Sequence, residues 1–341
     1  MKFVLAPLAE FTDAPFRRLC GEFGAETTYT EMVSAAALFH GHAPTRHLME
    51  TMPGEVPVVC QLFGANEDEI AFAAREASAL RTGDCPRFCE INLNAGCPMP
   101  RIMKSGSGAK LVTNPDLVYR LLKAIVDNTT LPVTLKTRLG PKIGENTIFE
   151  LADAAERAGA KGLVVHARYT SQMHGGPVHL ETLAEVVQRT RLPVTGNGGI
   201  KTEADAEAMS KTGVTAIMVA RTALRDPAIF ARLRGTVPSF SGTVPSSSRG
   251  TVPSFSGTVP SLTPVEMARR HLRYLIEFRK ILAEKFPNDH ILDEDAFIAL
   301  KARTHLFRYF AGIPGAAALR KRFNAVQTLA DVNSLLDGDA C

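Results

Sequence analysis

A single cysteine follows a predicted strand, and turn-forming and cationic residues surround it. The stretch 91–111 reads INLNAGCPMPRIMKSGSGAKL, with Cys97 between Gly96 and Pro98 and with Arg101 and Lys104 after it. Glycine and proline end a strand and shape the turn that follows. An ordinary thiol has a pKa of about 8.5, so at neutral pH it is mostly protonated and can donate a proton. The pattern therefore favours a catalytic thiol.

Two other interpretations of Cys97 stay open on the residues alone. Buried cysteines are mostly structural. A zinc site with Cys85, Cys89 and His166 is the second alternative. The three residues between Cys85 and Cys89 make a poor spacing for structural zinc, so we predict no metal.

Further polar side chains stand where other apolar runs end. They are Gln61, Asn94, Lys136, Arg138, His166, Arg168 and Asn197. The ends of purely structural strands have no need of so many amide, imidazole and cationic groups. Together they predict a binding site at one edge of a sheet.

The segment GNGGI (196–200) and the later VAR (219–221) suggest a phosphate site. Backbone N–H groups around Asn197, Gly198 and Gly199 would meet the anion together with Arg221. A plain glycine turn is the alternative. With Lys136 and Gln61 on other strands, the site suits a phosphorylated planar ring such as a flavin, whose reduced form a lysine would stabilise.

Short apolar runs alternate with helix-like segments through the first 230 residues. Continuous rather than alternating hydrophobicity is typical of parallel strands covered on both faces. The predicted strands are 3–7, 27–32, 56–64, 89–96, 133–140, 162–168, 193–199 and 216–221, and helices are predicted at 67–80 and 115–128. Eight such units predict a (β/α)8 TIM barrel. A doubly wound sheet is the runner-up, but no Gly-x-Gly-x-x-Gly turn follows the first strand.

The composition changes after the barrel. GTVPS occurs four times within 234–261, a low-complexity tract that cannot bury enough apolar surface to fold. A helix then starts at Thr263-Pro264, and more helical segments follow. We predict three regions: a barrel at 1–233, a linker at 234–261 and a small helical domain at 262–341.

The whole chain has 341 residues, a net charge of +4 and six scattered cysteines. Unpaired cysteines and the short N-terminal apolar run predict a cytoplasmic protein with reduced thiols. No stretch approaches the roughly 20 apolar residues of a membrane span. The net charge does not by itself indicate a polyanionic partner.

A basic run in the helical region does indicate one. Between Phe297 and Ala325 there are no acids but six cations: Lys301, Arg303, Arg308, Arg320, Lys321 and Arg322. The alternative is an ordinary solvated face beside a core of aromatic residues. A run wholly free of acids favours a surface that contacts nucleic-acid phosphates.

The stretch 91–109 resembles the signature of the tRNA-dihydrouridine synthases, in which a strand ends in Asn-x-Gly-Cys-Pro. Other motifs agree in order. They are APLAEFTDAPFRRLC near the N-terminus, then CQLFG, LKTRLG, VVHAR and GNGGI, and FRYFAGIPGAAALRKRFN in the helical region. The resemblance covers the chain outside the repeat tract. It departs at Leu8, Glu10 and Ala220, where the family usually has methionine, glycine and glycine.

The resemblance implies an FMN enzyme that uses NADPH to reduce the C5–C6 double bond of uridine in tRNA. By position, FMN would be held by Pro7, Leu8, Ala9, Gln61, Lys136, His166, Asn197, Gly198, Gly199, Ala220 and Arg221. Cys97 would be the general acid, and Asn94 would hold the uracil. The remaining tRNA contacts would be Arg101, Lys104, Arg138, Arg168, Lys301, Arg303, Arg320, Lys321 and Arg322.

Two other functions remain as alternatives at this point. A flavin oxidoreductase acting on a small molecule, such as a free pyrimidine, would share the barrel site but would not need the basic helices. A barrel that binds RNA without turnover would not need Cys97. We expect the tRNA enzyme, acting as a monomer.

Overall fold

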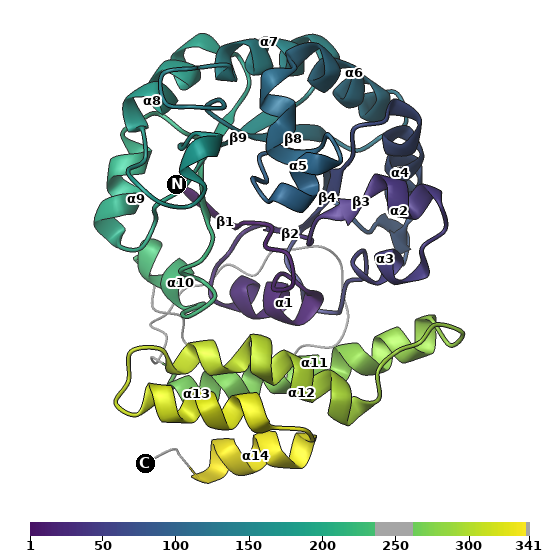
Figure 1. Ribbon diagram of the computed structural model, residues 1–341, viewed down its shortest axis with the longest axis vertical. Coiled ribbons are helices and arrows are strands. Elements are labelled where there is room, and N and C mark those ends of the chain that lie inside the picture. The colour runs from purple at the N-terminus through teal and green to yellow at the C-terminus, as the bar shows by residue number, and fades with distance from the viewer. Residues whose placement is uncertain (236–261, 339–341) are drawn as a thin grey trace. The chain divides into compact units, whose positions relative to one another are not determined.

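Eight parallel strands, joined by helices, form the first part of the protein (Figure 1). The computed structural model describes residues 1–235 and 262–338. The barrel strands are β1 (Lys2–Leu5), β2 (Thr28–Tyr29), β4 (Val58–Phe63), β7 (Glu90–Ala95), β8 (Val133–Arg138), β9 (Gly162–His166), β10 (Val194–Asn197) and β11 (Ala216–Val219). They confirm the eight strands predicted from the sequence.

The sheet closes on itself. Its hydrogen-bonded order is β1-β11-β10-β9-β8-β7-β4-β2, and a parallel bridge from Val4 to Thr27 brings the two end strands together. A short strand, β3 (Val33–Ser34), extends the β4 side. The (β/α)8 barrel is therefore confirmed, and the doubly wound alternative is wrong.

Helices and short turns cover the outside of this barrel, as Figure 1 shows. They are α2 (Ala35–Phe39), α3 (Ala43–His47), α4 (Glu67–Ala79), α6 (Pro115–Val126), α7 (Ile148–Ala158), α8 (Leu180–Arg189) and α9 (Glu203–Ser210). Between β7 and α6 lie α5 (Pro100–Lys104) and a 3₁₀ turn, η1 (Gly108–Thr113), and η2 (Thr170–Gln172) follows β9. A small hairpin pairs β5 (Arg81–Thr82) with β6 (Cys85–Pro86).

The interior of the barrel is partly apolar. Five strands contribute to one buried cluster: Val4, Ala6, Tyr29, Val59, Val164 and Met218, with Ala220 packed against it. Gln61 of β4, Asn92 and Asn94 of β7, and Thr134 of β8, which face the same way as this cluster, are instead polar. The barrel interior therefore has an apolar side and a polar side, and the polar side positions the site.

The protein divides into two compact units, and each is described here by itself. The barrel unit comprises Met1–Thr12, Glu26–Thr51 and Pro57–Ala220. The helical unit comprises Asp13–Ala25, Met52–Val56 and the described residues from Arg221 onward. The repeat tract 236–261 lies outside the described residues, so the linker and the predicted domain limits stay predictions.

Six helices and a 3₁₀ turn make up the helical unit. They are α1 (Ala14–Glu22), α10 (Ile229–Leu233), α11 (Pro264–Lys285), α12 (Glu294–Thr304), η3 (Leu306–Phe310), α13 (Ala316–Ala325) and α14 (Leu329–Gly338). Thr263 caps α11 in a capping box with Glu266, as its sequence predicts. Across the described ranges 1–235 and 262–338, none of the helices combines the length and apolar character of a membrane span.

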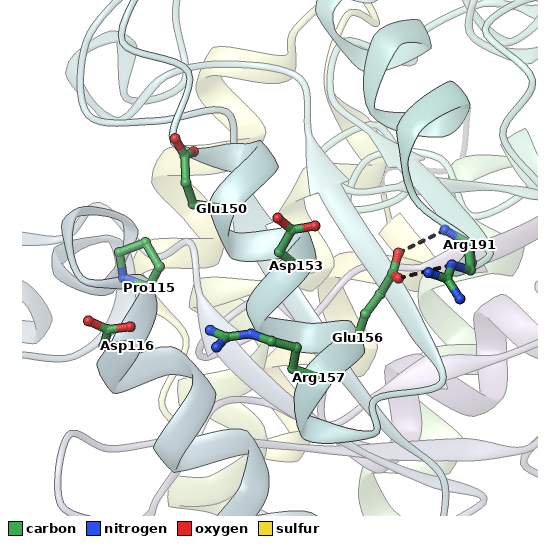
Figure 2. A pocket seen from close by; sticks show the side chains of 7 residues that line it. All are labelled: Pro115, Asp116, Glu150, Asp153, Glu156, Arg157 and Arg191. Carbon is green, nitrogen blue, oxygen red and sulfur yellow. Dashed lines mark hydrogen bonds and ion pairs between the residues drawn. The ribbon is translucent and has the colours of Figure 1, made fainter.

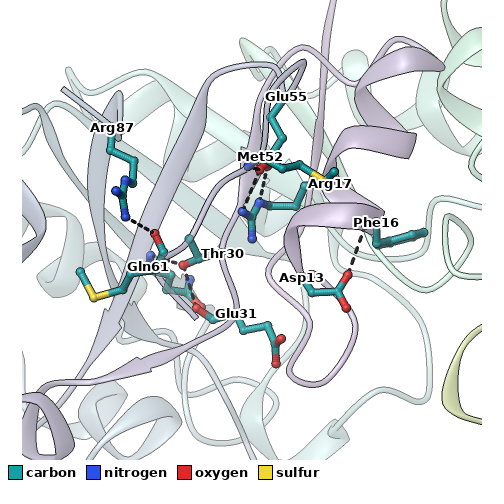
Figure 3. A network of polar contacts seen from close by, with 10 residues as sticks. Asp13, Phe16, Arg17, Thr30, Glu31, Met52, Glu55, Gln61 and Arg87 are labelled. Carbon is teal, nitrogen blue, oxygen red and sulfur yellow. Dashed lines mark hydrogen bonds and ion pairs between the residues drawn. The ribbon is translucent and has the colours of Figure 1, made fainter. Parts of the chain in front are cut away.

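The early helix α1 is tied into the helical unit by polar contacts. The buried Arg17 guanidinium donates to Glu55 at 2.7 Å, and the side chain of Asp13 caps α1 by accepting from the N–H of Phe16 (Figure 3). The other oxygen of Asp13 pairs with Lys301 of α12 at 2.6 Å. Residues from the start of the chain thus belong to the same unit as the C-terminal helices.

Candidate active site

The turn after β7 is built around the side chain of Asn94. Its Oδ1 accepts the backbone N–H groups of Gly96 at 3.1 Å and Cys97 at 3.0 Å. Its Nδ2 donates to the Oε1 of Gln61 at 2.8 Å. This Asx-type turn holds the half-buried Cys97 at the carboxyl end of the strand, where barrel enzymes place their catalytic groups.

Gly108 lies close to the backbone of Cys97. Its φ of 61° lies in the left-handed region, and a Cβ there would come within 2.7 Å of the Cys97 carbonyl oxygen. The N–H of Ala109 donates to that same carbonyl at 2.8 Å. The spacing from Cys97 to Gly108 in the sequence therefore reflects a close backbone approach, which only glycine permits.

Cationic groups crowd the neighbouring strand ends. Burial, and then the charge of Arg138, lower the pKa of Lys136 to about 7, while Cys97 acts to raise it. Burial likewise holds the pKa of His166 well below its usual value, and Arg138, Lys136 and Arg168 add to this effect. An anion bound here would favour the charged forms of these groups. The end of the barrel formed by the carboxyl ends of the strands, here called the barrel mouth, is therefore suited to an anionic ligand.

Asn197 links this cluster to the glycine turn after β10. Its Oδ1 accepts from the Lys136 ammonium at 3.1 Å, and its Nδ2 donates to the Met218 carbonyl at 2.8 Å. Gly198 and Gly199 follow with φ of 117° and 82°. A Cβ on Gly198 would make a tight 3.3 Å contact with the His166 ring, and the φ of Gly198 already favours glycine there.

The residues present fit a phosphorylated ring cofactor. The Nδ1 of His166 is buried and has no hydrogen-bond partner in the described part of the chain. The backbone of the glycine turn lies beside that ring, and Lys136 supplies a cation. Among the residues 1–235 and 262–338, no group of three or more metal-ligating side chains is found.

The other predicted cofactor contacts lie at the ends of the first and last strands. Pro7 and Leu8 are half-buried, Ala9 is exposed, and the half-buried Ala220 packs against the interior cluster. Arg221 is exposed and belongs to the helical unit. The barrel unit therefore contains all the predicted cofactor residues except Arg221.

Glu10 stands where the resemblance leads one to expect glycine. Its φ of 71° is left-handed, and its N–H donates to the carboxylate of Glu31. Such a φ costs a non-glycine residue free energy, which explains why glycine suits this position. Glu10 therefore adopts a backbone conformation that glycine would adopt without strain.

Three predicted tRNA contacts are placed differently from what the sequence suggests. Arg138 is 2 % exposed and donates to the carbonyl oxygens of Gly96, Tyr169 and Met173. Arg168 is also buried and donates twice to the Gly176 carbonyl. Lys301 pairs with Asp13. The charged groups of all three hold backbone carbonyl groups or a carboxylate of this chain.

The remaining predicted tRNA contacts are exposed cations. Arg101 and Lys104 lie on α5 in the barrel unit, and Arg303, Arg320, Lys321 and Arg322 lie on α12 and α13 in the helical unit. Arg320 and Arg308 both lie over the ring of Phe307, each 5.1 Å from its centre. The three cations of α13, Arg320, Lys321 and Arg322, are thus all exposed.

Sequence reasoning missed the polar residues behind Gln61 and Asn94, namely Glu90, Asn92 and Thr134. The signal was present in EINLN, where polar residues alternate with apolar ones at positions 90, 92 and 94. Alternation places them all on one face of β7. A prediction of continuous hydrophobicity for this run leaves out its inward-facing polar side.

A separate hollow lies on the outside of the barrel unit, as Figure 2 shows. It is lined by Pro115, Asp116, Glu150, Asp153, Glu156, Arg157 and Arg191. The ion pair of Arg191 with Glu156 closes one side of it. None of these residues stands at the carboxyl end of a barrel strand, so the hollow is not the candidate active site.

Comparison with known proteins identifies the family of this chain. The family model of dihydrouridine synthases matches residues 4–340. A probable tRNA-dihydrouridine synthase of Treponema pallidum is 36 % identical over 239 residues, covering 67 % of this chain and 69 % of that protein. A protein of Synechocystis named probable tRNA-dihydrouridine synthase 1 is 31 % identical, covering 97 % of this chain and 84 % of that protein. The chain therefore belongs to the dihydrouridine synthase family, oxidoreductases that act on uridine in tRNA.

Proposed function

We propose that the protein reduces the C5–C6 double bond of uridine in tRNA with FMN as its cofactor, NADPH as the electron donor and Cys97 as the acid. The turn geometry carries this proposal: Asn94 accepts two backbone N–H groups and so holds the thiol at the barrel mouth beside Lys136. An acid fixed at the mouth is what protonation of a buried substrate carbon needs.

Different residues at the barrel mouth would bind the FMN cofactor and the uracil substrate. Lys136, His166, Asn197, Gly198 and Gly199 would hold the phosphorylated ring, together with Gln61, the segment Pro7, Leu8 and Ala9, Ala220 and Arg221. When bound and reduced, FMN would supply the hydride that C6 of the uracil accepts. The Cys97 thiol then donates its proton to C5, and Asn94 holds the base.

The target uridine must leave the tRNA stack to reach this mouth. Arg101 and Lys104, which are exposed on the helix that follows Cys97, would contact phosphate. The exposed cations Arg303, Arg320, Lys321 and Arg322 would hold the rest of the tRNA. We propose that the protein acts as a monomer.

Nucleoside mass spectrometry of tRNA from a deletion strain tests this function. Dihydrouridine should disappear from at least one tRNA position and return when the wild-type gene is restored. Full dihydrouridine content in the deletion strain, combined with turnover of free pyrimidines by the purified enzyme, would instead establish a small-molecule oxidoreductase.

The basic face of α13 gives a second prediction. Affinity for tRNA falls as salt rises, and we expect alanine at Arg320, Lys321 and Arg322 to make this dependence less steep. The slope of log affinity against log salt should become less negative by about 2–3, since each lost phosphate contact removes about 0.7–0.9 from its magnitude. Binding titrations at several salt concentrations measure this. Lys211→Ala, which changes an exposed lysine at the C-cap of α9, is the control and should leave the slope unchanged. An unchanged slope in the triple variant would contradict this role for α13.

A further inference from the structure

A row of buried polar side chains runs through the interior of the barrel behind the candidate active site. We call these residues the polar row: Glu90, Thr134, Asn92, Gln61 and Asn94. Asn92 of β7 stands in register with Gln61 of β4 on one side and with Thr134 of β8 on the other. Gln61 and Asn92 are fully buried, and Asn94 and Thr134 are nearly so.

Each member of the polar row is hydrogen-bonded to the next. The Nδ2 of Asn94 donates to the Oε1 of Gln61 at 2.8 Å. The Nε2 of Gln61 donates to the Oδ1 of Asn92 at 2.8 Å, and the Nδ2 of Asn92 donates to the Thr134 hydroxyl at 2.7 Å. The Thr134 hydroxyl in turn donates to the carboxyl group of Glu90. All the donors therefore point toward Glu90.

This direction is fixed at the end of the row nearest the cysteine. The backbone N–H groups of Gly96 and Cys97 can only donate, so Asn94 must turn its oxygen toward them. The side-chain nitrogen of Asn94 must then donate to Gln61, which accepts through its side-chain oxygen. The side-chain nitrogen of Gln61 is left to donate to Asn92.

The opposite end of the row imposes the same direction. A carboxylate only accepts hydrogen bonds, and a protonated carboxyl group still accepts through its carbonyl oxygen. Burial raises the pKa of Glu90 to about 7, although the Thr134 hydroxyl acts to lower it, so both forms are populated near neutral pH. As a carboxylate, Glu90 accepts the hydrogen bond from the Thr134 hydroxyl, which leaves the Thr134 lone pairs to accept from Asn92.

The position of Gln61 is secured by a further contact outside the row. Its backbone N–H donates to the Thr30 hydroxyl at 3.0 Å (Figure 3). In the described part of the chain, no side-chain nitrogen or oxygen of Gln61, Asn92, Asn94 or Thr134 is buried without a partner. Buried polar groups so completely bonded specify one arrangement and strengthen one another.

We propose that Glu90, Thr134 and Asn92 are positioning residues of the reductase, which fix the orientation of the Gln61 and Asn94 amides at the barrel mouth. The inference rests on the proposed function. The three residues touch neither substrate nor cofactor in this scheme. From the Glu90 end they reinforce the amide orientation that the Gly96 and Cys97 N–H groups impose from the other end, and so they make the Asn94 turn hold the thiol more firmly.

The substitution Thr134→Val tests the polar row, because it keeps the shape of the side chain and removes the hydroxyl that joins Asn92 to Glu90. We expect the dissociation constant of the apoprotein for FMN, measured by quenching of flavin fluorescence, to rise about 5- to 20-fold, at or below the roughly 10- to 100-fold losses caused by removing the partners of ligands at metal sites. The value of kcat for dihydrouridine formation should fall by a similar factor, with the KM for tRNA within twofold. Thr134→Ser should restore both properties.

A matched control is available at Thr28. This threonine is fully buried on β2, and its hydroxyl has no partner in the described residues. Thr28→Val therefore removes a buried hydroxyl without touching the polar row, and FMN affinity should stay at the wild-type value. Thr134→Val with wild-type FMN affinity and kcat would overturn the proposal, and so would an equal loss in Thr28→Val.

Variants of Glu90 keep the test decisive if Thr134→Val does not fold. Glu90→Gln retains an acceptor for the Thr134 hydroxyl, whereas Glu90→Met removes it. FMN affinity should fall about 2- to 5-fold in Glu90→Met and remain near wild type in Glu90→Gln, and equal affinities would overturn the proposal. The wild-type protein in the same assay tests the proposed function separately, because dihydrouridine formation there does not depend on the outcome for the variants.

Discussion

Replacing Cys97 with alanine should lower the rate of dihydrouridine formation by about 10²- to 10⁴-fold, the contribution expected of a positioned general acid. The reason is that C5 of the uracil must take a proton inside the barrel mouth, where the thiol is held by the Asn94 turn. Single-turnover assays with the FMN-loaded enzyme and tRNA from a deletion strain measure this rate.

The location of the defect distinguishes a lost acid from a damaged site. Cys97→Ala should bind FMN with wild-type affinity, since the backbone bonds from Gly96 and Cys97 to Asn94 do not involve the thiol. NADPH should also reduce the bound flavin at the wild-type rate. Cys85→Ala, an exposed cysteine in the β5–β6 hairpin, is the matched control and should keep full activity. A Cys97→Ala enzyme that retains a third of the wild-type rate would exclude the acid role.

Replacing Lys301 with methionine should lower the free energy of unfolding by about 3 kcal/mol, because it leaves the buried carboxylate of Asp13 without its cation. Lys301, His271 and the Phe16 N–H together hold the pKa of Asp13 below its ordinary value, against the opposing effect of burial. Urea denaturation at neutral pH measures the change. Arg303→Met, an exposed cation on the same helix, should alter stability by less than about 0.5 kcal/mol.

The double variant Asp13→Asn/Lys301→Met sharpens this test. Asparagine keeps the cap on α1 and removes the charge, so it should recover a large part of the loss caused by Lys301→Met alone. The salt dependence of tRNA affinity should be unchanged in Lys301→Met, in contrast to the α13 triple variant. A reduced salt slope in Lys301→Met with unchanged stability would restore Lys301 to the set of phosphate contacts.

Much of the fold follows from local patterns in the sequence. Eight apolar runs of strand length, separated by helical segments, require a parallel sheet with helices outside, and eight such units close into a barrel. The helix starts at Asn66 and Thr263 also follow locally, because each side chain caps the helix after it. Strand spacing likewise brings Gln61, Asn94, Cys97, Lys136, His166 and Asn197 to one end of the barrel.

The sequence by itself determined the barrel, the position of the thiol and the family to which the chain belongs, because each depends on residues close together or on repeated strand ends. Only the tertiary structure decided which groups the individual charged side chains contact. Lys301 meets Asp13 across 288 residues, and Arg138 binds carbonyl groups of two other loops. The polar row likewise depends on the register of three strands. Hydrogen bonds and ion pairs need atoms within about 3 Å, and that proximity arises from packing between distant segments.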